Sequence, residues 1–350
     1  MNVVLNLICF IFILGIIVLV HEFGHFIFAK MFGIYVYEFA IGMGPKIFSK
    51  KGKGQETEYS IRAIPIGGFV QLAGEEIDDD KKVPKDRKLY SKPAWQRFLV
   101  MFFGAGNNFI LAFLVLFVGA LIWGSPDMDP VITKVTPNYP MSEAGIKAND
   151  TIIAINNHKT STMDDVRLYL TLNKDGEDVL FKIKDTNGNI KEVNVKPKEE
   201  EVNGEKTYRI GLEFENNTEY GFVRSIKYAF RKMGALFKQM VVVLKNLFTG
   251  GLSVSNLSGP VGIYTIVGET REAGLSSLFQ LIALLSLNVG FINLLPFPAF
   301  DGGRILFLII EKIKGSPVKT ETENLVHTIG FIILMLLMLY VTFNDVLRLF

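Results

Sequence analysis

The chain has 350 residues, of which 49% are hydrophobic and only 21% are charged. Its mean hydropathy of +0.31 is above that of ordinary soluble domains and opposite to that of disordered chains, so both classes are disfavoured. The net charge of +2 implies no broad field for nucleic acid, and we expect no nucleic-acid partner. The single cysteine, Cys9, excludes an intramolecular disulfide and a cysteine-rich zinc site.

The apolar residues are gathered in four stretches. These are Leu7–Val20 with its continuation Phe26–Ala29, Phe98–Trp123, Leu278–Ile310 and Ile329–Val341. Each can supply about 20 residues, the length that crosses a ~30 Å hydrocarbon layer as a helix. We therefore predict a polytopic α-helical membrane protein with four transmembrane segments. A cleaved signal peptide is the alternative for the first stretch, but a basic N-terminal region and a small-residue cleavage site are missing there.

Two polar regions separate the apolar stretches. Lys30–Arg97 is rich in lysine, whereas Ser125–Tyr220 is acidic on balance and is typical of a folded domain. The positive-inside rule assigns Lys30–Arg97 and the short link Lys312–Thr328 to the cytoplasm. The amino terminus, the Ser125–Tyr220 domain and the carboxyl terminus are then expected outside.

Polar residues interrupt the first apolar stretch at His21–His25, whose sequence is HEFGH. Residues four apart share one face of a helix, so the imidazoles of His21 and His25 can reach one Zn²⁺. Glu22 lies between them in sequence and is suited to act as general base for a water molecule. Ordinary polar residues at an exposed helix end are the alternative. Apolar residues resume after His25, however, and ionisable groups inside a membrane are costly and usually functional.

A catalytic zinc site needs a third protein ligand. The candidates in this chain are Asp301, Glu311, His158 and His327. We favour Asp301 because it is the only acid inside the third apolar stretch and follows the helix-breaking residues Pro296 and Pro298. An N-cap for a helix over Arg304–Lys312 is its alternative role. A salt bridge is sufficient to explain Glu311, His158 is expected on the surface, and His327 near the membrane interface.

Two glycine-containing segments lie in the lysine-rich region, at Gly42–Pro45 and Ile64–Phe69. We predict short strands at Glu58–Ile64 and Gly68–Leu72 about a turn. Plain turns are one interpretation of the glycines. The other is a β element that reaches the active site and holds a substrate strand by backbone pairing.

The acidic region combines strand and helix patterns. The predicted strands are Pro130–Val135, Thr151–Asn157, Asp178–Ile183 and Lys191–Val195, with a short helix and turn in Pro140–Asp150 and a helix at Met163–Thr171. Such a domain could bind an extended peptide or act as a spacer that restricts access, and both interpretations stay open. Phe222–Phe248 is predicted as a basic amphipathic helix lying on the membrane or on the protein, and Ser258–Gly262 as a loop.

Together these motifs resemble the site-2 protease family of zinc intramembrane metalloproteases, in particular its bacterial regulator-of-sigma-E type. The resemblance rests on His21–His25, on Asn293–Pro298 followed by Asp301-Gly302, and on the inserted domain. Pro65–Val70 and Ser258–Tyr264 also look like family motifs. Nearly the whole chain is covered.

The resemblance implies His21, His25 and Asp301 as zinc ligands and Glu22 as the base. It further implies substrate binding by Asn293, Pro296, Pro298, Gly42, Gly44, Gly67 and Gly68. It also implies cytoplasmic-side β-hairpin elements and one inserted extracytoplasmic PDZ-like α+β domain. The protein would then reside in the bacterial cytoplasmic membrane, with its active site near the cytoplasmic side.

The expected organisation therefore has seven parts. They are a first transmembrane segment (1–30), a membrane-associated β region (31–94), a second transmembrane segment (95–124), the PDZ-like domain (125–220), an amphipathic helix and linker (221–274), a third transmembrane segment (275–311), and a cytoplasmic link with the fourth transmembrane segment (312–350).

The implied function is zinc-dependent cleavage of transmembrane segments of single-pass membrane proteins, such as anti-sigma factors and signal-peptide remnants. Membrane lipid and a peptide ligand at the PDZ-like domain are the further expected partners. A non-catalytic membrane scaffold that presents the PDZ-like domain is one rival, and it predicts no bound metal. A metal transporter is another, and it predicts several sites along a path, whereas the sequence offers one cluster.

Overall fold

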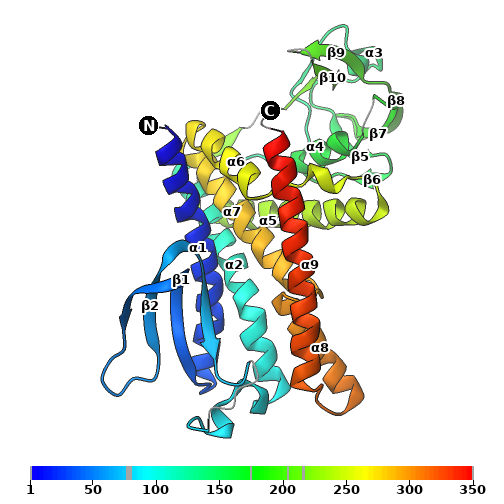
Figure 1. The fold of residues 1–350 in the computed structure, drawn as a ribbon. Coiled ribbons are helices and arrows are strands. Elements are labelled where there is room, and N and C mark those ends of the chain that lie inside the picture. Colours follow the sequence, from blue (N-terminus) through cyan, green and yellow to red (C-terminus); the bar gives the residue numbers. More distant parts are fainter. Residues whose placement is uncertain (1, 76–80, 174–175, 203–204, 215–216, 349–350) are drawn as a thin grey trace. The chain divides into compact units, whose positions relative to one another are not determined.

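The computed structural model describes residues 2–75, 81–173, 176–202, 205–214 and 217–348. The chain separates into two compact units. The first combines the residues up to Val115 with those from Val254 onward, and the second spans Leu116–Ser253. In Figure 1 the first unit consists of long helices and a β-hairpin, and the second is a small α+β domain with one long helix.

Long helices dominate the first unit. They are α1 (Asn2–Met31), α2 (Ala94–Trp123), which continues into the second unit, α6 (Pro260–Glu272), α7 (Leu275–Leu294), α8 (Asp301–Lys314) and α9 (Thr320–Leu347). Among the described residues, four helices are long and apolar enough to cross a membrane: α1, α2, α7 and α9.

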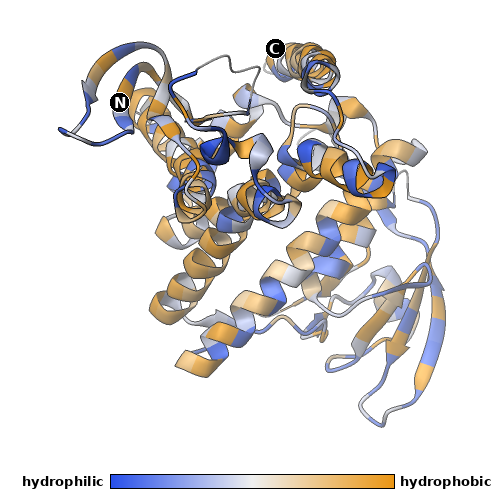
Figure 2. Cartoon of the chain, turned by 90° about the horizontal axis from the view of Figure 1, so that it is seen from below, coloured by the Kyte–Doolittle hydropathy of each residue, from blue (hydrophilic) through white to orange (hydrophobic). Residues whose placement is uncertain are grey.

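The surfaces of these helices fit a lipid environment. Figure 2 shows that the long helices are mostly hydrophobic. Large apolar side chains on them stay exposed, for example Phe12 on α1 and Leu336 on α9, each at 62%. Exposed apolar surface on this scale is typical of contact with lipid, so the chain is a multi-pass membrane protein.

The expected break in the third apolar stretch is confirmed. The stretch forms two helices, α7 and α8, because Pro296 and Pro298 interrupt the backbone hydrogen bonding between them. The helices differ from the sequence prediction at one loop. The predicted loop Ser258–Gly262 was too long: α6 already begins at Pro260, whose fixed φ suits the first position of a helix.

The β region also differs from the prediction of two short strands about a turn. Residues Glu58–Leu72 form one strand, β2, which pairs antiparallel with β1 (Val36–Lys50) and lies along α1. Gly67 has a φ of +84°, and the register shifts repeatedly, so the strand bends where a reversal was expected. Residues Glu38–Ile41 have partners in two parts of β2, around Ser60 and around Phe69.

Glu38 ties this bent hairpin together. Its carboxylate accepts hydrogen bonds from Ser60 Oγ at 2.5 Å and from the Arg62 guanidinium at 2.8 Å. Burial opposes the charge of Glu38, but the bonds from Ser60 and Arg62 outweigh it and hold the pKa of Glu38 below its ordinary value. The hairpin beside α1 is therefore held by a charged network as well as by its backbone pairs.

The second unit is built on a four-stranded sheet in the order β6-β5-β7-β8. Its strands are β5 (Thr151–Ile155), β6 (His158–Lys159), β7 (Val179–Lys184) and β8 (Ile190–Val195). Short strands form further pairs: β3 (Ser125–Pro126) with β12 (Thr218–Glu219), β4 (Lys134–Val135) with β11 (Leu212–Glu213), and β9 (Lys198–Val202) with β10 (Glu205–Arg209).

The core of this unit contains fully buried apolar side chains, among them Ile132, Met141 and Phe181. Two helices complete the domain, α3 (Pro140–Glu143) and α4 (Met163–Leu172). The predicted strand over Pro130–Val135 was too long. Only its last two residues form a strand, paired with β11. Val131 instead forms an isolated bridge with Thr151, so the segment divides its pairing between two partners.

The amphipathic helix α5 (Phe222–Thr249) lies on the protein, one of the two predicted alternatives. Its basic side chains pair with acids of the domain: Arg231 with Asp129 at 2.6 Å, Lys232 with Asp164 at 2.7 Å and Lys238 with Asp165 at 2.9 Å. Partly buried Val242 packs against the domain core. The positive charge predicted from the sequence thus serves, in these pairs, to attach the helix to its own domain.

Candidate metal centre

Three side chains from α1 and α8 converge in the first unit. His21 Nε2, His25 Nε2 and Asp301 Oδ2 are each 3.3 Å from the other two atoms. Both histidines are buried, and the Asp301 side chain is 15% exposed. This is a group of ligand atoms that could hold a metal ion.

The triangle has the dimensions of a zinc site. A tetrahedral zinc with bonds of about 2.0–2.1 Å has ligand atoms about 3.3 Å apart. Asp301 Oδ2 is buried and has no hydrogen-bond partner among the described residues, although both imidazoles lie beside it. Three acceptor atoms that face one another at this separation are better explained by a shared cation than by hydrogen bonds among them. The donor set of two imidazoles and one carboxylate therefore fits Zn²⁺.

The second nitrogen of His25 supports this arrangement. Its Nδ1 lies 2.9 Å from the carbonyl oxygen of Val100 on α2. A carbonyl can only accept, so Nδ1 carries the proton and the lone pair of the neutral ring is on Nε2, facing His21 and Asp301. Histidines that bind metal are commonly oriented by such a bond.

Glycines allow α1 and α2 to approach closely enough for this contact. A Cβ on Gly24 would lie 1.9 Å from the carbonyl oxygen of Phe103, and a Cβ on Gly104 would lie 2.3 Å from His25 Nε2. Both separations are far below van der Waals contact. The histidine ring thus lies directly on the backbone of α2, and any larger residue at position 104 must displace it.

Asp301 begins α8 directly after the break at residues 295–300. The N-cap of α8 is Phe300, so Asp301 is the first residue of the helix and not its cap. The tight entry into the helix depends on Gly302, because a Cβ there would lie 2.2 Å from the carbonyl oxygen of Leu295. The carboxylate is therefore directed toward the two histidines.

Glu22 lies beside the β-hairpin. A Cβ on Gly68 of β2 would be 3.6 Å from Glu22 Cγ, which is ordinary contact. Gly68 and Glu22 are therefore neighbours, whereas a Cβ on Gly67 would meet Met43 of β1 at 2.9 Å. Gly42 and Gly44 have positive φ angles of +84° and +81° and contact residue Ile64.

The other predicted substrate-binding residues lie around the break between α7 and α8. Asn293 Nδ2 donates to the Val289 carbonyl in its own helix at 3.0 Å. Pro296 is within the break, and Pro298 packs against Gly330 of α9.

The remaining ligand candidates do not join the three converging side chains. Glu311 accepts two hydrogen bonds from Arg97, at 2.9 and 3.1 Å. His158 is exposed in the second unit and stacks on Tyr169. His327 Nδ1 accepts from the backbone N–H of Ala299 at 3.1 Å.

Asn108 was not among the predicted site residues. It is fully buried on α2, one turn beyond Gly104, and neither side-chain amide atom has a hydrogen-bond partner within the described part of the chain. Its main-chain carbonyl oxygen accepts from Ser286 Oγ at 2.9 Å. An asparagine inside an apolar span was the available signal, since polar groups there are costly.

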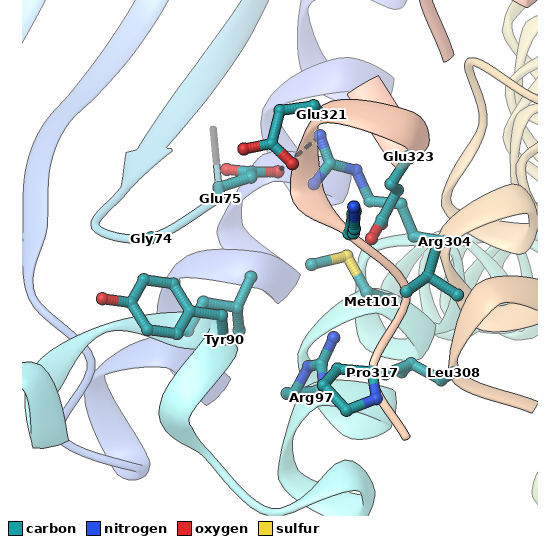
Figure 3. A pocket seen from close by; sticks show the side chains of 13 residues that line it. Gly74, Glu75, Tyr90, Arg97, Met101, Arg304, Leu308, Pro317, Glu321 and Glu323 are labelled. Carbon is teal, nitrogen blue, oxygen red and sulfur yellow. Dashed lines mark ion pairs between the residues drawn. The ribbon is translucent and has the colours of Figure 1, made fainter. Parts of the chain in front are cut away.

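The first unit also contains a cavity of about 430 Å³ with a charged lining, which Figure 3 shows; the three converging ligand residues are not part of that lining. Arg304 lies one turn after Asp301 on α8 and pairs with Glu75 at 3.4 Å. Met101, another lining residue, follows Val100, the residue that orients His25. The cavity therefore contacts both α8, which carries Asp301, and α2, which orients His25.

Comparison with known proteins adds independent information. The sequence model of peptidase family M50 matches residues 9–337. A protein of Clostridium acetobutylicum named as a zinc metalloprotease is 37% identical, with 97% of each chain covered. One of the same kind from Staphylococcus aureus is 35% identical over 100% of both chains. The regulator of sigma-W protease RasP of Bacillus subtilis is 34% identical over 99% of both chains.

Proposed function

Because the chain belongs to peptidase family M50, the site-2 proteases, we propose that this zinc metalloprotease cleaves transmembrane segments of single-pass membrane proteins within the membrane. The observation that carries the proposal is the buried triangle of His21, His25 and Asp301 on helices of a multi-pass membrane protein. These three residues would hold Zn²⁺, which supplies a Lewis acid for polarising the scissile carbonyl.

The chemistry of the protein's own residues follows from their positions. Glu22, adjacent to His21 on α1, accepts the proton of the attacking water and delivers it to the leaving amine. His25 is kept in the required tautomer by its bond to Val100. The buried amide of Asn108 is suited to donate a hydrogen bond to the oxygen that becomes negatively charged.

Substrate binding is proposed at the hairpin and at the break between α7 and α8. A helical carbonyl is hydrogen-bonded and covered, so a transmembrane substrate must be extended locally before cleavage. Gly68, beside Glu22, leaves room for such a strand to approach the base, with Gly42, Gly44 and Gly67 shaping the bent hairpin. The substrate would also contact three residues at the break between α7 and α8: Asn293, Pro296 and Pro298.

We further propose that the domain over residues 125–220 is PDZ-like and lies outside the cytoplasm, with the active site near the cytoplasmic face of a bacterial membrane. The relative named RasP is a regulator of sigma-W protease. For this chain, anti-sigma factors and signal-peptide remnants are the proposed substrates. The domain would bind a peptide or restrict access to the centre.

The test is cleavage of a single-pass model substrate by the purified full chain in lipid vesicles. We expect products whose new termini, mapped by mass spectrometry, lie inside the apolar segment, and we expect a zinc chelator to stop the reaction. Cleavage only in the polar flanks would contradict the intramembrane proposal. An intact substrate with a zinc-loaded protein would contradict the proposed catalysis and favour a non-catalytic role.

A further inference from the structure

The segment between α7 and α8 contains a backbone conformation that its sequence does not favour. Ala299 has a φ of +85°, the left-handed region in which the Cβ of an alanine crowds the following carbonyl. Ala299 precedes Asp301 by two residues, so its conformation sets where α8 begins and where the carboxylate is directed. Within the segment, the N–H of Phe300 donates to the Phe297 carbonyl at 3.2 Å and closes a turn around Pro298 and Ala299. An alanine in the left-handed region is still strained, so a further contact to its backbone bears on how firmly the turn is held.

That further contact comes from α9. His327 Nδ1 accepts the N–H of Ala299 at 3.1 Å, and the ring of His327 lies 5.7 Å from that of Phe307 on α8. Figure 1 shows α9 beside α8. One turn further along α9, Gly330 packs against Pro298, where a Cβ would lie 2.4 Å from Pro298 Cβ.

Within the described residues, the bond to the Ala299 N–H is the one hydrogen bond that the His327 ring makes. To accept at Nδ1, the neutral ring must carry its proton on Nε2, and that atom is buried without a partner in the described part of the chain. An imidazole within an apolar span is costly, so its one polar contact calls for a functional explanation. Neither ring nitrogen belongs to the three converging ligand atoms.

We propose that His327 is a positioning residue for the metal centre. By accepting the N–H of Ala299, it holds residue 299 in the left-handed conformation and so keeps the Asp301 carboxylate at its distance from His21 and His25. The inference rests on the proposed function, because it matters only if Asp301 binds the metal. It assigns to α9 a role in metal affinity that is carried by one hydrogen bond.

The test compares three replacements in the purified full chain: His327→Ala, His327→Asn and His327→Gln. Asparagine presents its side-chain oxygen near the place of Nδ1, whereas glutamine presents its amide further out. Zinc affinity is measured by competition with a chelator, and the ligand field by the visible spectrum of the Co²⁺-substituted protein. We expect His327→Ala and His327→Gln to weaken zinc binding by about 10–100-fold and to alter the Co²⁺ spectrum. His327→Asn should restore both.

Failure of this inference can be told apart from failure of the proposed function. If Asp301→Ala binds zinc as tightly as the unchanged chain, the proposed function fails. If Asp301→Ala loses zinc but all three His327 variants bind it normally, only the positioning role is overturned. Equal losses in His327→Asn and His327→Gln would also overturn it. Should His327→Ala fail to fold, the contrast between asparagine and glutamine still decides.

Discussion

The metal centre of the first unit and the exposed ion pairs of the second unit use polar side chains in opposite ways. In the first unit, His21, His25 and Asp301 are largely shielded from solvent and converge on one point. In the second, ion pairs such as Lys134 with Glu213 are exposed, at 65% and 56% of their side-chain surfaces. Ionisable groups buried inside an apolar span are costly and mark functional sites, whereas exposed pairs contribute little to stability. The difference identifies which residues should matter most.

The largest effect is expected at Glu22. Glu22→Gln removes the base but keeps the size of the side chain, so cleavage should fall by at least about 100-fold. Zinc content and thermal stability should stay unchanged, because the substitution leaves the three ligand atoms in place. Cleavage rates, metal analysis and melting curves on the same preparation check this. A variant that cleaves at the normal rate would remove Glu22 from the mechanism.

The second largest effect is expected from a substitution in the core of the second unit. Phe181 is fully buried, and Phe181→Ala is expected to cost about 3–5 kcal/mol of the stability of that unit. Zinc content should persist, because the three ligand atoms lie outside Leu116–Ser253. Limited proteolysis combined with metal analysis measures both quantities. Loss of zinc in Phe181→Ala would show that metal binding depends on the folding of the second unit.

A smaller effect is expected from the close contact between α1 and α2. Gly104→Ala introduces a Cβ 2.3 Å from His25 Nε2, so the ring must move and activity should fall about 10–100-fold. Gly106→Ala is the matched control in the same helix, because its nearest atom is a Phe103 side-chain carbon at 3.2 Å. Cleavage assays compare the two variants. Equal activities would argue against the tight packing of His25 on α2.

The smallest effect is expected at an exposed ion pair of the second unit. Lys134→Ala removes the partner of Glu213 and should change the free energy of unfolding by less than about 1 kcal/mol, with cleavage unchanged. Thermal unfolding measures this directly. A loss comparable to that of Phe181→Ala would contradict the contrast between buried and exposed polar groups.

The parts of the structure that were predictable from the sequence are those with local signals. The four apolar helices follow from hydropathy, and the spacing within HEFGH follows from the helical repeat. The convergence of Asp301 with the histidines is a long-range contact. The sequence suggested it through the cost of an acid in an apolar stretch, through the helix-breaking prolines before it and through the family resemblance, but not through any local spacing.

Other features depend on partners far along the chain. The strand β2 was expected to pair with itself, but its partner is β1, and no local pattern specifies that choice. The bond between Ala299 and His327 joins residues on different elements, and an alanine in the left-handed region carries no sequence signal. Such contacts emerge only when the elements are assembled.

The most direct test of the account is the zinc stoichiometry of the purified full chain and of two variants on α8. We expect about one zinc per chain in the unchanged protein and in Glu311→Gln, whose acid pairs with Arg97. Asp301→Ala should retain little or none under the same conditions. A full complement of zinc in Asp301→Ala would contradict the proposed metal centre.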